Sequence, residues 1–171
     1  MGDLNIGERI SVEGLKHRIP RIVDPQYMMR LTVEPREYEP IAMSDEYDYF
    51  CGLVEQIGNC HLANEEIALV ANPTRVPGNF NRLMIRGRHM GISLSTYGQR
   101  FHQFPLIARG TATEIIAFRQ SDPDDVRDFD KRIAPSISPI PLNQLPPHHF
   151  IRYTPTTGAV YHAPMLLVEV S

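Results

Sequence analysis

The chain has 171 residues, enough for one domain with a hydrophobic core, and its 42% hydrophobic and 22% charged content is ordinary for a soluble globular protein. The net charge of −3 gives no overall attraction to nucleic acid or membrane, and no apolar run reaches the roughly 18–20 residues that a membrane span requires. Lys16 and Lys131 are the only lysines among 17 basic residues, so arginine dominates. That bias fits high-GC codon usage or recognition of phosphate and carboxylate by planar guanidinium groups.

Periodicity and turn residues predict the first elements in chain order. We expect a short helix over 9–18, strands over 21–25 and 30–35, and a strong helix over 44–58. Ser44 is the expected N-cap of that helix and Gly58 its end. An apolar strand then begins at residue 59 and meets two carboxylates, Glu65 and Glu66.

The second half continues the alternation of helix and strand. The pattern predicts a helix over 79–90, strands over 92–98 and 113–118, and an acid-capped helix over 121–133. Residues 134–147 read as a proline-rich connector, and 149–164 as a terminal hairpin that turns at Thr157-Gly158. Together these elements predict a single α/β domain over 1–171 with a mostly parallel central sheet, flanking helices and a C-terminal β-hairpin.

The charge map has one long window without acids. Residues 67–113 contain no Asp or Glu, while acids crowd 44–55 and 121–130 on either side. One interpretation is a positive edge that meets phosphate, DNA or an acidic face of a neighbouring subunit. The alternative is that the flanking acids fold back onto these arginines within one subunit. The predicted partner or nucleic-acid contacts are Arg75, Arg82, Arg86, Arg88, Arg100 and Arg109.

Several short motifs occur in a family-specific order. A strand C-H-L-A-N-E-E precedes a helix that ends R-G-R-H-M-G, and a strand I-S-L-S-T-Y-G then leads to Q-R-F. An apolar strand running into F-R and a segment L-P-P-H-H-F follow. Over residues 19–155 this order resembles the DNA-translocating and DNA-packaging P-loop ATPases of the HerA–FtsK type, and most of all the small ATP-binding proteins of phages.

The resemblance implies a P-loop-NTPase-like fold and roles for individual residues. Glu65 and Glu66 would correspond to the strand-end acids that act on the attacking water, and Gln99 to the strand-end sensor of the γ-phosphate. Arg88, together with Arg86, would lie at a subunit edge and reach the nucleotide of a neighbouring subunit. A ring or other homo-oligomer is therefore implied.

The sequence departs from that family at the phosphate loop and at the metal ligand. The pattern G-x-x-x-x-G-K-[ST] is matched only by Gly2 and Gly7, with Glu8 in place of Lys and Arg9 in place of Ser/Thr. The family's first strand would precede Gly2, so we expect a domain truncated at its N-terminus. Asn64 stands where the family has the metal-holding Asp, and the amide lacks the charge that favours Mg²⁺.

Other catalytic constellations are weak. The adjacent histidines His148 and His149 point to opposite faces of a strand, so we expect no metal site. Ser93 and Ser95 lack a G-x-S-x-G elbow. Cys51 and Cys60 have no metal-ligand spacing and read as free thiols.

We therefore expect a degenerate, catalytically inactive ATPase-like protein that acts as a structural or assembly component of a phage particle or its DNA-packaging apparatus. No cofactor is expected in that case. Two alternatives stay open: an active or partner-activated packaging ATPase that uses ATP and Mg²⁺, and a nucleic-acid-binding accessory protein. Expected partners are other copies of the chain or a larger assembly, with DNA in the alternatives and no membrane, located in the cytoplasm or the virion.

Overall fold

The computed structural model describes residues 8–22, 31–34, 40–133 and 140–163. The first unit consists of β1 (Glu8–Ser11), α1 (Val12–Ile22) and β2 (Leu31–Glu34), and β1 pairs in parallel with β2. The Ser11 hydroxyl accepts a hydrogen bond from the Gly14 N–H at 3.1 Å and so caps α1. The strand predicted at 30–35 is confirmed.

Two predictions in this unit are wrong. The helix expected over 9–18 begins later, at Val12, because Glu8–Ser11 forms strand pairs with β2. Residues 21 and 22 of the expected strand over 21–25 belong to α1, and the other three residues lie outside the described part of the chain. The buried side chains of α1, Val12 and Leu15, pack against Leu53, which holds this unit on the next helix.

That helix, α2 (Pro40–Ile57), confirms the strongest helix prediction but not its start. It begins at Pro40, where proline is tolerated because the first helical N–H groups have no partner inside the helix. Ser44 is therefore inside α2 and is not its cap. Its buried hydroxyl donates to the Val70 carbonyl at 3.0 Å. Gly58, with φ +61°, ends the helix as predicted.

The central unit is a parallel pair, β3 (His61–Asn64) and β4 (Ser93–Thr96), with His61 opposite Ser93. The connection between them contains the 3₁₀ turn η1 (Ile67–Leu69), the helix α3 (Gly78–Arg86) and the 3₁₀ turn η2 (Gly87–Met90). Strand, helix and strand are thus where the sequence predicted them, although β3 is shorter and the last turn of the predicted helix is the 3₁₀ turn η2. A buried apolar cluster joins this unit to α2: Cys51, Val54, Leu62, Ile67, Val70, Ala71, Phe80, Leu83 and Ile92.

The C-terminal unit is an antiparallel sheet in the order β5-β6-β7. Its elements are η3 (Phe101–Gln103), α4 (Leu106–Thr111), β5 (Ile115–Phe118), α5 (Pro123–Ile133), η4 (Leu142–Gln144), β6 (Phe150–Thr154) and β7 (Gly158–His162). The predicted hairpin is confirmed as β6–β7, and Gly158, with φ +71°, starts β7 after the turn. A second buried cluster lies under this sheet: Phe101, Phe129, Leu142, Leu145, Ile151 and Ala159.

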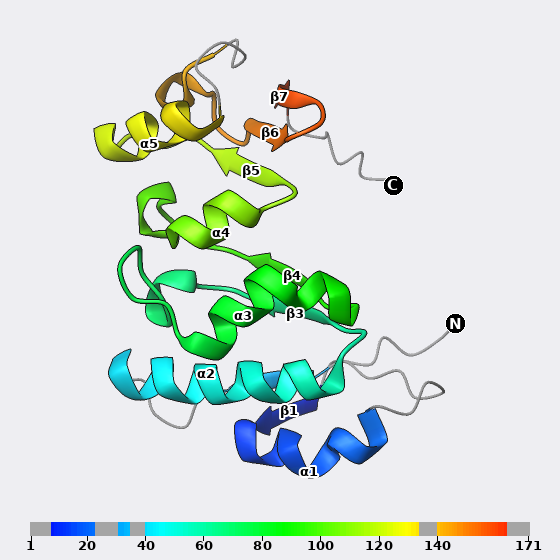
Figure 1. Cartoon of the computed structure of the whole chain (residues 1–171). Helices are drawn as coiled ribbons and strands as arrows, with labels where there is room; N and C mark the ends of the chain where they lie inside the picture. Colours follow the sequence, from blue (N-terminus) through cyan, green and yellow to red (C-terminus); the bar gives the residue numbers. More distant parts are fainter. Residues whose placement is uncertain (1–7, 23–30, 35–39, 134–139, 164–171) are drawn as a thin grey trace, which may run out of the picture.

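The architecture is mixed α/β with parallel strands and a C-terminal hairpin, as expected. The described strands form two parallel pairs and one antiparallel sheet rather than one continuous parallel sheet. β5 joins the hairpin because its alternate residues Ile115 and Ala117 pack on the same cluster as Ile151. Figure 1 shows the units following one another through the molecule roughly in chain order, from α1 at one end to β6–β7 at the other.

Candidate functional site

The C-terminal ends of β3 and β4 lie side by side and carry the predicted carboxylates and glutamine. The Tyr97 N–H donates to the Asn64 carbonyl at 2.9 Å, and the Ile67 N–H donates to the Tyr97 carbonyl at 2.9 Å. Glu65 and Glu66 lie between these two bonds on the segment after β3. Gln99 lies two residues after Tyr97 on the segment after β4. The two strand-end motifs therefore meet at one edge of the parallel pair, the edge at which open α/β sheets bind ligands.

Gly98 allows the backbone after β4 to pack closely against neighbouring side chains at this edge. A Cβ atom there would lie 2.9 Å from the Phe104 ring and 3.0 Å from the Ile67 side chain. Only glycine allows the backbone to approach these side chains so closely. Gln99 itself is exposed, and its backbone carbonyl accepts a hydrogen bond from the Gln120 side chain at 3.2 Å.

Asn64 is turned inward and is bound to the protein. It is only 8% exposed, its amide nitrogen donates to the Tyr47 hydroxyl at 3.1 Å, and its amide oxygen accepts the Glu66 N–H at 3.3 Å. Burial raises the pKa of the Tyr47 hydroxyl well above its usual range, so this group stays neutral and can accept that bond. The Asn64 side chain thus fixes the turn after β3, and its oxygen is already engaged.

The two glutamates differ in their surroundings. Glu65 is exposed, whereas Glu66 is half-buried and its Oε1 atom is fully buried without a hydrogen-bond partner among the described residues. A buried carboxylate oxygen without a partner costs free energy, so structures normally satisfy such atoms. Glu66 is therefore the most unusual polar group at this edge.

The arginine window mostly folds back onto the flanking acids of the same chain. Arg100 contacts Asp122 at 2.7 Å and Asp125 at 2.9 Å, so the alternative of acids that fold back onto the window is confirmed for this residue. Three more window residues also pair with acids: Arg75 with Asp45 at 3.6 Å, Arg82 with Glu55 at 3.0 Å and Arg109 with Asp128 at 3.2 Å.

The acids of α5 thus have the structural role that the second interpretation of the charge map predicted, because they bind arginines of the same chain. Asp125 is completely buried, and it also accepts the His102 N–H at 2.6 Å. Asp128 binds the His102 ring nitrogen at 2.9 Å, and this hydrogen bond, with that from Arg109, lowers the pKa of the Asp128 carboxyl. The signal was present in the sequence, because Asp125, Asp128 and Phe129 fall on one face of a helix.

Arg86 and Arg88 behave differently from the rest of the window. Both are exposed, and neither forms an ion pair with any acid in the part of the chain that the structure describes. Arg88 lies in η2, before β4, whereas Gln99 follows β4, so the two residues are attached at opposite ends of a strand about 10 Å long. Within one chain, Arg88 is therefore not part of the edge that carries Glu65 and Gln99.

The residues proposed for a phosphate loop do not form one in the part of the chain that the structure describes. Gly2 and Gly7 lie outside the described residues, and Arg9 lies within β1, opposite Thr32. A phosphate loop connects a strand to the helix that follows it. At the first strand-to-helix junction in the described residues, β1 ends at Ser11 and α1 begins at Val12, with no loop between them.

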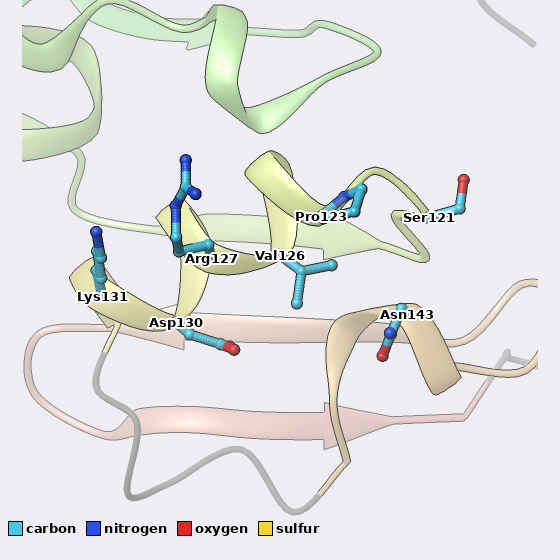
Figure 2. A pocket seen from close by; sticks show the side chains of 7 residues that line it. All are labelled: Ser121, Pro123, Val126, Arg127, Asp130, Lys131 and Asn143. Carbon is cyan, nitrogen blue, oxygen red and sulfur yellow. The ribbon is translucent and has the colours of Figure 1, made fainter.

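A surface pocket of about 440 Å³ lies between α5 and η4 (Figure 2). Val126 and Asp130 point into it, and Arg127 points away. None of the predicted site residues lines it. No group of His, Cys, Asp and Glu among the described residues has the arrangement of a metal site, and no described helix is long and apolar enough to cross a membrane.

No family model matches this sequence, and no curated protein matches it either. Solved structures do match. The genome packaging NTPase B204 from Sulfolobus turreted icosahedral virus 2 in complex with sulfate is 19% identical, with a TM-score of 0.72 over 97% of this chain and 77% of that chain. The complex of the same NTPase with ATP-gammaS is 20% identical, with a TM-score of 0.68 over 86% and 72%.

The chain therefore has a P-loop-NTPase-like fold. Its structural neighbours include a second protein, B204, the DNA-packaging ATPase from Sulfolobus turreted icosahedral virus, which is 20% identical with a TM-score of 0.61. At this level of identity the likeness establishes the fold, and the chemistry has to be argued from the residues of this chain.

Proposed function

We propose that this chain is a degenerate relative of viral packaging NTPases that does not hydrolyse ATP. The observation that carries the proposal is the direct passage from β1 to α1 at Ser11-Val12. A phosphate loop needs glycines whose backbone N–H groups surround the phosphates, and a Lys and a Ser/Thr that hold phosphate and Mg²⁺. The sequence contains no Gly-Lys pair at any position.

The edge at β3 and β4 supports the same proposal. Asn64 lacks the negative charge of the Asp that this strand carries in nucleotide hydrolases, and its amide is engaged by Tyr47 and the Glu66 N–H. A positioned Lys and a bound metal each contribute several kcal/mol to phosphoryl transfer. Loss of both would reduce the rate by many orders of magnitude.

A protein of this fold that does not hydrolyse ATP can still act as a subunit of an assembly. B204 is described as a genome packaging NTPase, and this chain shares its fold. We place the chain in the packaging apparatus or particle of a virus, as a homo-oligomer or as a subunit of a larger assembly. Arg86 and Arg88 are exposed and form no ion pair among the described residues, so they are available to contact an acidic neighbour.

Steady-state phosphate release with Mg²⁺ and ATP tests this proposal. We expect no release above the background of buffer alone, and no saturable heat in a calorimetric titration with ATP. Phosphate release that Glu65→Gln or Glu66→Gln abolishes would overturn the proposal, because it would show turnover at the β3 edge.

One observation favours an active or partner-activated ATPase as the second candidate. The Glu66 Oε1 atom has no hydrogen-bond partner among the described residues, so this oxygen is free to bind a water molecule once a partner or substrate opens its surroundings. Activation by a partner predicts that double-stranded DNA raises phosphate release in the wild type but not in Glu66→Gln. If DNA leaves release at background, this candidate is excluded.

A further inference from the structure

The antiparallel sheet β5-β6-β7 has two faces of different composition. Along each strand, alternate residues face the second apolar cluster, where Ile151 and Ala159 are almost completely buried. The residues between them form the opposite, outer face. By strand register this outer face contains Ile116, Phe118, Phe150, Arg152, Val160 and His162.

Three rings form a row across the outer face. Phe118, Phe150 and His162 are cross-strand neighbours, one from each strand. The ring centroids of Phe118 and Phe150 are 5.7 Å apart, and those of Phe150 and His162 are 4.9 Å apart with the rings nearly parallel. Phe118 is 55% exposed, which is unusual for a side chain that gains so much from burial.

The adjacent row combines apolar and cationic groups. Ile116, Arg152 and Val160 are cross-strand neighbours, and Ile116 and Val160 are 52% and 42% exposed. Glu114 precedes β5 and pairs with Arg152 at 2.7 Å, so it does not leave a free negative charge beside the rings. Arg119 follows Phe118, is exposed, and forms no ion pair within the described ranges.

We propose that this outer face binds single-stranded nucleic acid by stacking bases on Phe118 and Phe150, with Arg119 next to the phosphates. A sheet that presents exposed rings beside guanidinium groups suits unpaired bases, because every base has a face that can stack on an aromatic ring. Base pairs inside a duplex are already stacked on each other and cannot reach these rings. The proposal does not depend on ATP chemistry, nor on the edge formed by Glu65 and Gln99.

A tryptophan at position 118 provides a direct readout. The chain contains no tryptophan, so Phe118→Trp places the sole indole on the outer face. We expect its fluorescence to be quenched on titration with a 20-nucleotide oligo(dT), because the base stacks on the ring. A tryptophan at Tyr49, which is 41% exposed on α2 at the other end of the molecule (Figure 1), is the matched control and should not be quenched.

Affinity is measured separately, by the fluorescence anisotropy of labelled oligo(dT). Phe118→Ala should weaken binding about tenfold relative to the wild type, whereas Tyr49→Ala should leave it unchanged. Arg119→Ala should weaken binding less. It should also reduce the slope of log affinity against log salt concentration by about 1, as the loss of one phosphate contact does. Because Phe118 and Arg119 are exposed, both variants are expected to fold, and circular dichroism verifies this.

Three results would overturn the proposal. The first is no saturable binding of oligo(dT) at low salt. The second is binding that Phe118→Ala leaves intact and Arg88→Ala abolishes, which would assign nucleic acid to the arginines of α3 and η2. The third is a self-associating protein that Phe118→Ala converts to a monomer without any oligo(dT) binding, which would assign the outer face to a second copy of the chain.

Discussion

Gly91 has a left-handed backbone, with φ +71°, and ends the turn η2. A Cβ atom at this position would lie 2.1 Å from the Asn59 amide oxygen. Gly91→Ala therefore combines backbone strain with a steric clash, and we expect it to lower the free energy of unfolding by about 2 kcal/mol, measured by urea denaturation. Gly110→Ala is the control. It has open space in α4 and should be neutral or stabilising.

The ionisation of Asp128 makes the stability of the fold depend on pH. Hydrogen bonds from His102 and Arg109 lower the pKa of this carboxyl below its ordinary value of 3.8, so the folded state favours the charged form. This stabilisation is fully present above the ordinary pKa and is lost as the pH falls through the lowered pKa. Asp128→Asn should therefore cost about 2 kcal/mol at pH 7, because it leaves the buried Arg109 without its carboxylate, and the cost should shrink below pH 4.

Urea unfolding from pH 3 to pH 7 measures this difference. Asp124→Asn is the matched control, because Asp124 lies on the same helix but pairs with Arg127 where both side chains are more than half exposed. An exposed pair of this kind contributes little. Equal losses in the two variants would contradict the structural role of Asp128.

At the scale of elements, α3 depends on a residue that is distant in sequence. Its own N-cap position is Pro77, whose side chain cannot accept a hydrogen bond. Asp48 of α2 replaces the cap, accepting the N–H of Asn79 at 2.6 Å and of Phe80 at 3.2 Å. We expect Asp48→Ala to cost about 1–2 kcal/mol in thermal or urea unfolding, as loss of a helix cap does.

The neighbouring Asp45→Ala tests whether this loss is specific. Asp45 is exposed and lies 3.6 Å from Arg75, so its removal should change stability by less than about 0.5 kcal/mol. If both variants lose the same stability, Asp48 acts through general charge and not as the cap of α3.

The sequence predicted most elements because their apolar residues recur with clear periods. The helix α2, the strand β4 and the hairpin β6–β7 are cases in which a strong apolar pattern and a glycine signal coincide. The start of α2 was missed because Ser44 is a good local cap, whereas its hydroxyl instead bonds the Val70 carbonyl far along the chain. Local propensity contains no information about a hydrogen bond between residues this far apart in sequence.

At the scale of the whole molecule, the two kinds of arginine predict opposite effects. Arg100→Ala removes both carboxylate contacts of Arg100 and leaves the fully buried Asp125 without its cation, so we expect a clear loss of stability. Arg88→Ala removes an exposed side chain without an ion pair among the described residues. It should leave the melting temperature unchanged and weaken self-association instead.

Light scattering at low salt, read beside thermal unfolding, separates the two effects. The expected pattern is an intact assembly of reduced stability for Arg100→Ala, and a stable protein of lower mass for Arg88→Ala. A wild-type chain that stays monomeric at high concentration and low salt would refute the association of identical copies through Arg88.

The sequence by itself determined the mixed α/β class, the order of the strand-end motifs and the resemblance to packaging ATPases, because these depend on local periodicity and on residue types at fixed spacings. Only the tertiary structure decided the partners of the charges. The acid-free window allowed either a free positive edge or pairing with the flanking acids, and in the structure Arg75, Arg82, Arg100 and Arg109 pair with acids of the same chain. Which charges meet depends on how helices distant in sequence pack together, and no pattern along the chain carries that information.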